Sequence, residues 1–132
     1  MTEQRNPYQG APPRPWIRVA LVAPDGTTRD LQVLADTGSP FALVVARSTL
    51  QQFQSIGVPS VSSNFGDLEG GWLRLQIPDA GIDEDVLAYG SDKVARAVES
   101  SHPDFEGLAG LPLLRMMEYG GDRDEFWIRD QP

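Results

Sequence analysis

The chain is 132 residues long, carries a formal net charge of −8 and contains no cysteine. One domain with a modest core fits this length, and without cysteine neither a disulfide framework nor a thiolate metal site is possible. The excess of acids disfavours nucleic-acid binding, which needs a clustered basic surface. The N-terminus lacks the apolar core of a signal peptide, and no apolar run approaches the span of a bilayer. We therefore expect a soluble, cytoplasmic protein that binds neither nucleic acid nor membranes.

Residues 1–15 contain proline, glutamine, asparagine and glycine without hydrophobic periodicity. This composition predicts a flexible N-terminal tail or an extended arm, so the folded domain is expected to span residues 16–132. Its first element is predicted to be a hairpin. Trp16–Val22 alternates between apolar and polar residues, Pro24–Thr27 carries turn residues, and Thr28–Ala35 supplies the returning strand.

The middle of the chain is predicted to hold a short helix and a second hairpin. A strand at residues 41–45 leads into helix-tolerant residues 46–53, and Gly57 follows as a helix stop. Residues 58–63 and 72–77 have the β-branched or alternating composition of paired strands. Turn residues separate them in two groups, which are Asn64, Phe65, Gly66 and Asp67, then Glu69, Gly70 and Gly71.

The rest of the chain alternates between turns, strands and helices. Its predicted elements are a turn at 78–83, a strand at 85–89, a helix at 92–100, a strand at 105–110, a helix at 112–119 and a strand at 125–129. Many short strands, two or three short helices and frequent Gly and Pro turns predict a mostly β domain closed like a small barrel. The sequence has no zinc-ligand spacing and no nucleotide-type glycine loop, so we expect neither a metal nor a cofactor.

The motif Asp36-Thr37-Gly38-Ser39 lies between two apolar runs, LQVLA before it and FALVV shortly after it. These runs predict buried strands, which would place an ionisable carboxylate at a tight turn beside the core. A buried acid costs several kcal/mol unless it is hydrogen-bonded, paired or protonated, and the neighbouring polar residues meet only part of that need. Asp36 is therefore the leading candidate for a functional residue. The simpler alternative is an aspartate that caps its own turn.

Two segments carry a resemblance to a known family. Leu34-Ala35 followed by Asp36-Thr37-Gly38-Ser39 and a strand resembles the active-site loop of aspartic proteases, and the short chain resembles their single-domain, retroviral-type (retropepsin-like) branch. Leu108, Ala109 and Gly110, followed by a predicted helix, resemble the motif that the family places after its second half. The resemblance covers residues 16–128. It implies the aspartic protease fold, a small closed β-barrel with one half-site per chain.

The resemblance implies an aspartic endopeptidase in which Asp36 is catalytic and Thr37, Gly38 and Ser39 complete the active-site loop. Peptide hydrolysis by this route uses one carboxylate as a base toward water and one carboxylic acid as a donor to the scissile carbonyl. The chain has a single Asp-Thr-Gly, so two chains would form a symmetric homodimer whose paired Asp36 carboxylates share one proton. Thr37 would brace the two loops, and Gly38 would turn its N–H toward the carboxylate. The substrate would be a peptide or an unfolded protein.

The hairpin at Phe65–Gly71 occupies the place of the family's flap, the mobile cover that excludes water and holds substrate. Its expected substrate-binding residues are Phe65, Gly66, Gly70 and Gly71, and the alternative is an ordinary exposed hairpin. Two features depart from the retroviral pattern: the acids Asp67 and Glu69 near the tip, and Leu111-Pro112 where retroviral members often have an arginine. Residues 125–129 are expected to pair with their symmetry mate or to form a plain edge strand.

A second function stays open, a non-catalytic retropepsin-like module that binds a peptide or dimerises without cleavage. His102, the only histidine, has no nucleophile or ligand partner at a suitable spacing, and we expect it in a solvated loop. The acids at 79, 83, 84 and 85 lack the ligand order and the glycine of an EF-hand, so we expect them in a solvated turn.

Overall fold

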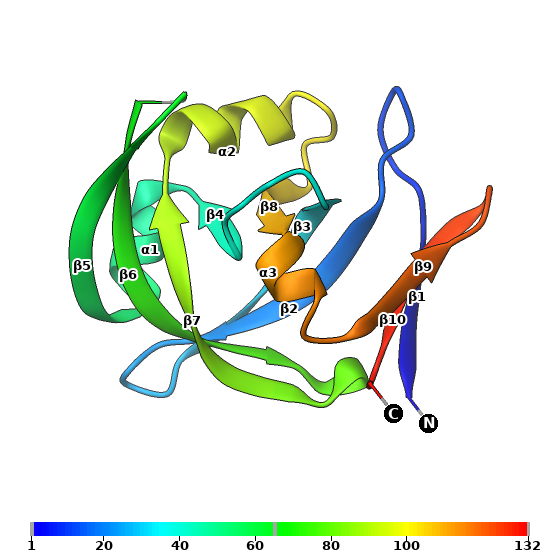
Figure 1. Cartoon of the computed structure of the whole chain (residues 1–132), viewed down its shortest axis with the longest axis horizontal. Helices are drawn as coiled ribbons and strands as arrows, with labels where there is room; N and C mark the ends of the chain where they lie inside the picture. The colour runs from blue at the N-terminus through cyan, green and yellow to red at the C-terminus, as the bar shows by residue number, and fades with distance from the viewer. Residues whose placement is uncertain (1, 65, 132) are drawn as a thin grey trace.

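The computed structural model describes residues 2–64 and 66–131 and shows a mostly β protein with a closed, mixed six-stranded barrel and three short helices (Figure 1). Each barrel strand pairs with the next one in the ring, and β6 closes the ring by pairing with β2. In ring order the strands are β2 (Trp16–Val22), β3 (Thr28–Asp36), β8 (Phe105–Gly110), β4 (Leu43–Val45), β7 (Ile82–Gly90) and β6 (Gly66–Ile77). The predicted fold class is confirmed.

The interior of the barrel forms the main hydrophobic core. Ile17, Val19 and Leu21 alternate along β2 and are almost fully buried, whereas Arg18 between them is exposed. A strand with a period of two places one set of side chains inside and the other outside. The register of β2 on β3 confirms the first predicted hairpin.

The second predicted hairpin is also present, but its returning strand is longer than expected. β5 (Gln54–Ser63) lies outside the ring and pairs with β6, which runs through the residues predicted as a turn at 69–71. A Cβ atom at Gly70 would lie 2.4 Å from the side chain of Val58, and one at Gly71 would lie 2.2 Å from that of Gln54. The turn prediction at 69–71 is therefore wrong, because these glycines make room for side chains of β5 within a strand.

Two of the predicted helices are confirmed, α1 (Arg47–Phe53) and α2 (Asp92–Glu99). The hydroxyl of Ser91 caps α2 by accepting a hydrogen bond from the Val94 N–H at 3.2 Å. Val94 and Val98, one turn apart, are buried on the side of α2 that faces the barrel. The turn predicted at 78–83 contains a short 3-10 helix, η1 (Pro78–Ala80), but it ends earlier than expected because β7 begins at Ile82. The expectation of a solvated turn for the acids at 83, 84 and 85 is therefore wrong, since they pair with β6.

The third helix, α3 (Leu111–Leu114), ends well before the predicted residue 119. The following segment forms strand β9 (Glu118–Gly121), which pairs with β10 (Glu125–Arg129). A Cβ atom at Gly120 would lie 2.6 Å from the ring of Trp127. The glycine that was expected to end a helix thus belongs to a strand, where it leaves space for a tryptophan.

Strand β1 (Glu3–Pro7) lies in the segment for which the sequence predicted a flexible tail. It pairs with β10 along its whole length. Asn6 is buried and its Nδ2 donates to the carbonyl of Trp16 at 3.2 Å, while Trp16 Nε1 donates to the carbonyl of Pro7 at 2.7 Å. Local composition could not reveal this strand, because its partner lies at the opposite end of the chain (Figure 1).

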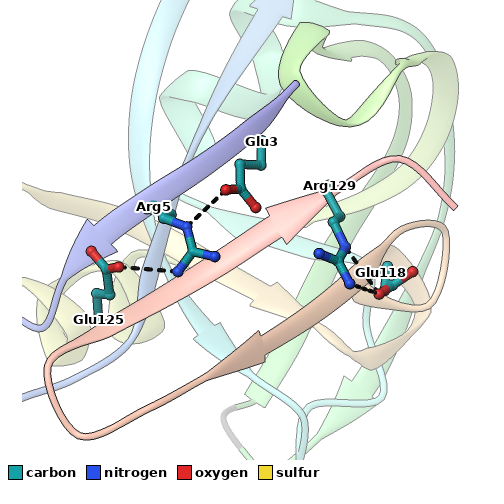
Figure 2. Close-up of polar contacts among 5 residues, drawn as sticks. All are labelled: Glu3, Arg5, Glu118, Glu125 and Arg129. Carbon is teal, nitrogen blue, oxygen red and sulfur yellow. Dashed lines mark hydrogen bonds and ion pairs between the residues drawn. The ribbon is translucent and has the colours of Figure 1, made fainter. Parts of the chain in front are cut away.

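β10 is the central strand of this second sheet, whose order is β1-β10-β9. Figure 2 shows the ion pairs on the outer face of this sheet. Arg5 pairs with Glu3 at 2.8 Å and with Glu125 at 3.1 Å, and Arg129 Nε pairs with Glu118 at 2.9 Å. Because both edges of β10 are occupied within the chain, the expectations of an edge strand and of direct pairing with a symmetry mate are wrong for this conformation.

Within residues 2–64 and 66–131, no helix combines the length and apolarity needed to cross a membrane. The same residues hold no group of three or more His, Cys, Asp or Glu side chains placed to bind a metal ion. His102 lies in the loop before β8, where its Nδ1 accepts a hydrogen bond from the Asp104 N–H at 3.1 Å.

Candidate active site

The two motifs that carry the family resemblance lie side by side. Asp36 is the last residue of β3 and is in register with Gly110 at the end of β8. β8 runs between β3 and β4, parallel to the first and antiparallel to the second (Figure 1). The strand that enters the Asp36 loop and the strand that leaves it therefore both pair with the Leu108-Ala109-Gly110 segment.

Gly110 fits between the loop and β8 only because it has no side chain. A Cβ atom there would lie 1.9 Å from the carbonyl oxygen of Phe41 and 2.7 Å from that of Ser39. The backbone also binds the loop directly, since the Gly110 N–H donates to the carbonyl of Ala42 and the Leu111 N–H donates to the carbonyl of Ser39, both at 3.1 Å. Gly110 thus holds the Asp36 loop through backbone contacts.

The carboxylate of Asp36 is held by its own loop. The Gly38 N–H donates to Asp36 Oδ1 at 2.9 Å, as the resemblance implied, and the Ser39 N–H donates to the Asp36 carbonyl at 3.1 Å. Asp36 is half-buried, Thr37 and Gly38 are exposed, and Ser39 is buried. The structure records no ion pair for Asp36 within the described residues. The sequence predicted a more deeply buried acid, but the loop projects its Thr-Gly segment into solvent.

A small hollow of about 300 Å³ adjoins Asp36. Asp36 and Thr37 line it together with Arg14, Pro15 and Phe126. The hollow is far smaller than an extended peptide, but it leaves the carboxylate accessible. This side of the loop is therefore open to a second chain or to a substrate.

The hairpin predicted as a flap has its tip next to Phe65, which lies outside the described residues. Gly66 has a φ of +86° with open space around it, so it serves the turn. The Ser63 hydroxyl donates to the Gly66 carbonyl at 2.9 Å, and the Ser62 hydroxyl donates to Asp67 Oδ1 at 3.2 Å. Asp67 therefore has a partner within the hairpin. The structure places Gly70 and Gly71 along β6, away from this tip.

Glu69, the second acid that departs from the family pattern, is bound to α1. It forms an ion pair with Arg47 and accepts a hydrogen bond from Gln51 Nε2 at 3.2 Å. The hydrogen bond from Arg47 lowers the pKa of the Glu69 carboxyl below its ordinary value. Glu69 thus links the base of the hairpin to α1. The sequence predicted this helix but not its link to Glu69.

A larger groove of about 500 Å³, which no sequence motif indicated, opens next to the Asp36 loop. Its aromatic walls are Phe41, from the loop after Ser39, Tyr89 of β7 and Trp72 of β6. The rings of Phe41 and Tyr89 lie 4.9 Å apart at 59°, and Trp72 is 40% exposed. The sequence carried one sign of this groove. Trp72 alternates with Leu73, which is buried, so the tryptophan faces outward.

Comparison of the chain with protein-family models, with curated protein sequences and with solved structures gave no match. The relationship to retropepsin-like proteases therefore stays a prediction from the two motifs.

Proposed function

We propose that this protein is an aspartic endopeptidase that hydrolyses peptide bonds through a water activated by two Asp36 carboxylates, one from each chain of a homodimer. The observation that supports it most is the position of Asp36, at the end of β3 beside Gly110, with its carboxylate held by the Gly38 N–H. The exposed Thr37 and Gly38 leave this loop accessible to a second copy. A loop with these contacts offers half of a two-carboxylate site.

In the proposed mechanism one Asp36 is ionised and the other is protonated. The ionised carboxylate removes a proton from the water as it attacks the scissile carbonyl, and the protonated one donates to the carbonyl oxygen. Two carboxylates at hydrogen-bond distance cannot both ionise easily, so the pair keeps one proton. The Gly38 N–H fixes the orientation of each carboxylate and the hairpin of β5 and β6 covers the bound peptide.

The alternative is a non-catalytic module of the same fold, which binds a peptide without cleaving it. One observation favours this reading: β10 is paired on both edges within its own chain. A dimer would then have to form through the Asp36 loops or through the outer edges of β1 and β9. An interface limited to such contacts would be small, and small interfaces are weak.

Cleavage of an unfolded protein between about pH 4 and 7 separates the two functions. Wild type is expected to cut, with higher activity at acidic pH because acid supplies the shared proton and reduces repulsion between two acidic chains. Asp36→Asn changes little in size but removes the base, and its activity is expected to be lost. A transition-state-mimicking aspartic protease inhibitor should abolish wild-type activity. Undiminished cleavage by Asp36→Asn, or none by wild type over this range, would leave the binding module as the better account.

A further inference from the structure

The groove beside the Asp36 loop combines aromatic walls with an acidic rim. Phe41, Trp72 and Tyr89 form the walls, and the charged residues that line it are Glu84 and Asp85 of β7. Phe41 from the segment leading into β4, Pro112 of α3 and Met116 just after α3 line the same groove. No basic side chain lines it. The groove is therefore apolar on its walls and negative at its edge.

The two acids on the rim are available to a ligand. Arg74, the cation opposite Asp85 in the register of β6 on β7, is engaged by Asp83, with two contacts of 2.7 Å. Arg74 and Asp85 both line a separate hollow, and there the guanidinium of Arg74 is held by its two contacts with Asp83. Among the described residues neither Glu84 nor Asp85 has a recorded ion pair, and both are exposed.

We propose that this groove binds an arginine or lysine side chain of an extended peptide. The aliphatic stem would pack on Trp72 and Phe41, the cationic head would lie over an aromatic face, and Glu84 and Asp85 would accept its hydrogen bonds. A purely apolar side chain would leave the acids unused. The formal charge of −8 adds long-range attraction for a basic peptide.

The position of the groove relates it to the proposed active site. Phe41 follows Asp36 by one short loop, and Pro112 follows Gly110, the register partner of Asp36. Trp72 lies on β6, the strand that returns from the hairpin tip. This inference rests on the proposed function in one respect: the basic side chain would belong to the peptide that is cleaved at Asp36, which makes basic segments the substrate class.

Binding of short fluorescent peptides by the Asp36→Asn protein tests the inference without cleavage. The probes share one sequence and differ at a single central position, which is arginine, citrulline or leucine. Citrulline keeps the shape of arginine and removes its charge. We expect the arginine peptide to bind about fivefold to tenfold more tightly than the other two, with an advantage that shrinks in high salt. The double substitution Glu84→Gln and Asp85→Asn should remove this advantage and leave citrulline binding unchanged.

Glu99→Gln is the control, because it removes an exposed carboxylate on α2 that does not line the groove. It should keep the arginine preference, whereas Trp72→Ala should weaken binding of the arginine peptide. Equal or tighter binding of the leucine or citrulline peptide overturns the inference, as does an equal loss in Glu99→Gln or no binding of any probe. An arginine preference without wild-type cleavage overturns the proposed function alone, and cleavage without that preference overturns this inference alone.

Discussion

Gly110 determines whether the loop that carries Asp36 can form. A methyl group at this position would overlap the carbonyl oxygens of Phe41 and Ser39, and these backbone atoms cannot move away without breaking the hydrogen bonds between the loop and β8. We expect Gly110→Ala to lower the free energy of unfolding by about 3 kcal/mol. Urea denaturation of the purified variant measures this loss.

Gly57→Ala is the control for that measurement. Its Cβ atom would have its nearest neighbours at 3.9 Å, an ordinary van der Waals contact. We expect this variant to stay within about 1 kcal/mol of wild type. If both variants had the same stability, close packing at Gly110 would not be what fixes the Asp36 loop.

Single residues were predictable from sequence where a short motif determines the local backbone geometry. Asp36 and Gly110 were identified, and their adjacency follows from two motifs on neighbouring strands. Phe41, Trp72 and Glu84 were not identified as a group, because they come from three separate segments that meet only in the folded barrel. The positions of Gly70 and Gly71 were misjudged, since their partners are side chains of β5.

At the scale of elements, Glu69 links the hairpin of β5 and β6 to α1. Hydrogen bonds from Arg47 and Gln51 lower the pKa of its carboxyl below the ordinary value of 4.5. A lowered pKa in the folded state means that the stabilisation is complete above the ordinary pKa and is lost as the pH falls through the lowered one. We therefore expect Glu69→Gln to reduce the urea midpoint at pH 7, and the difference from wild type to shrink as the pH falls below 4.5.

Glu84→Gln provides the comparison for Glu69→Gln, because Glu84 is an exposed acid without a recorded ion pair in the described chain. It should leave the urea midpoint unchanged at pH 7. A pH-independent difference between wild type and Glu69→Gln would show that the ion pair with Arg47 does not support the hairpin.

Most helices and strands were predictable from the local pattern of residues in the sequence. Both hairpins and the helices α1 and α2 come from alternation, turn residues and helix-tolerant composition. β1 and β9 were missed for one reason: each exists because β10 lies beside it, and β10 is distant from β1 in the sequence. The two glycines of β9 are typical of the end of a helix, but one of them makes room for Trp127 within the strand.

At the scale of the whole molecule, the proposed function requires a dimer. Two copies would carry a formal charge of about −16, which opposes association. We expect sedimentation at micromolar concentration to show a dimer whose affinity rises with moderate salt, since salt screens this repulsion. A strict monomer at every accessible concentration and salt would remove the two-carboxylate mechanism.

The most direct measurement mixes active and inactive chains. Wild type is held at a fixed concentration above the dimer dissociation constant, Asp36→Asn is added, and cleavage of an unfolded protein is followed at acidic pH. Added wild type serves as the control. A mixed dimer has one aspartate and one asparagine at the shared site, so activity per wild-type chain should fall to about half at equal amounts and further with excess variant. Activity that stays constant as the variant is added would contradict a site shared between two Asp36 residues.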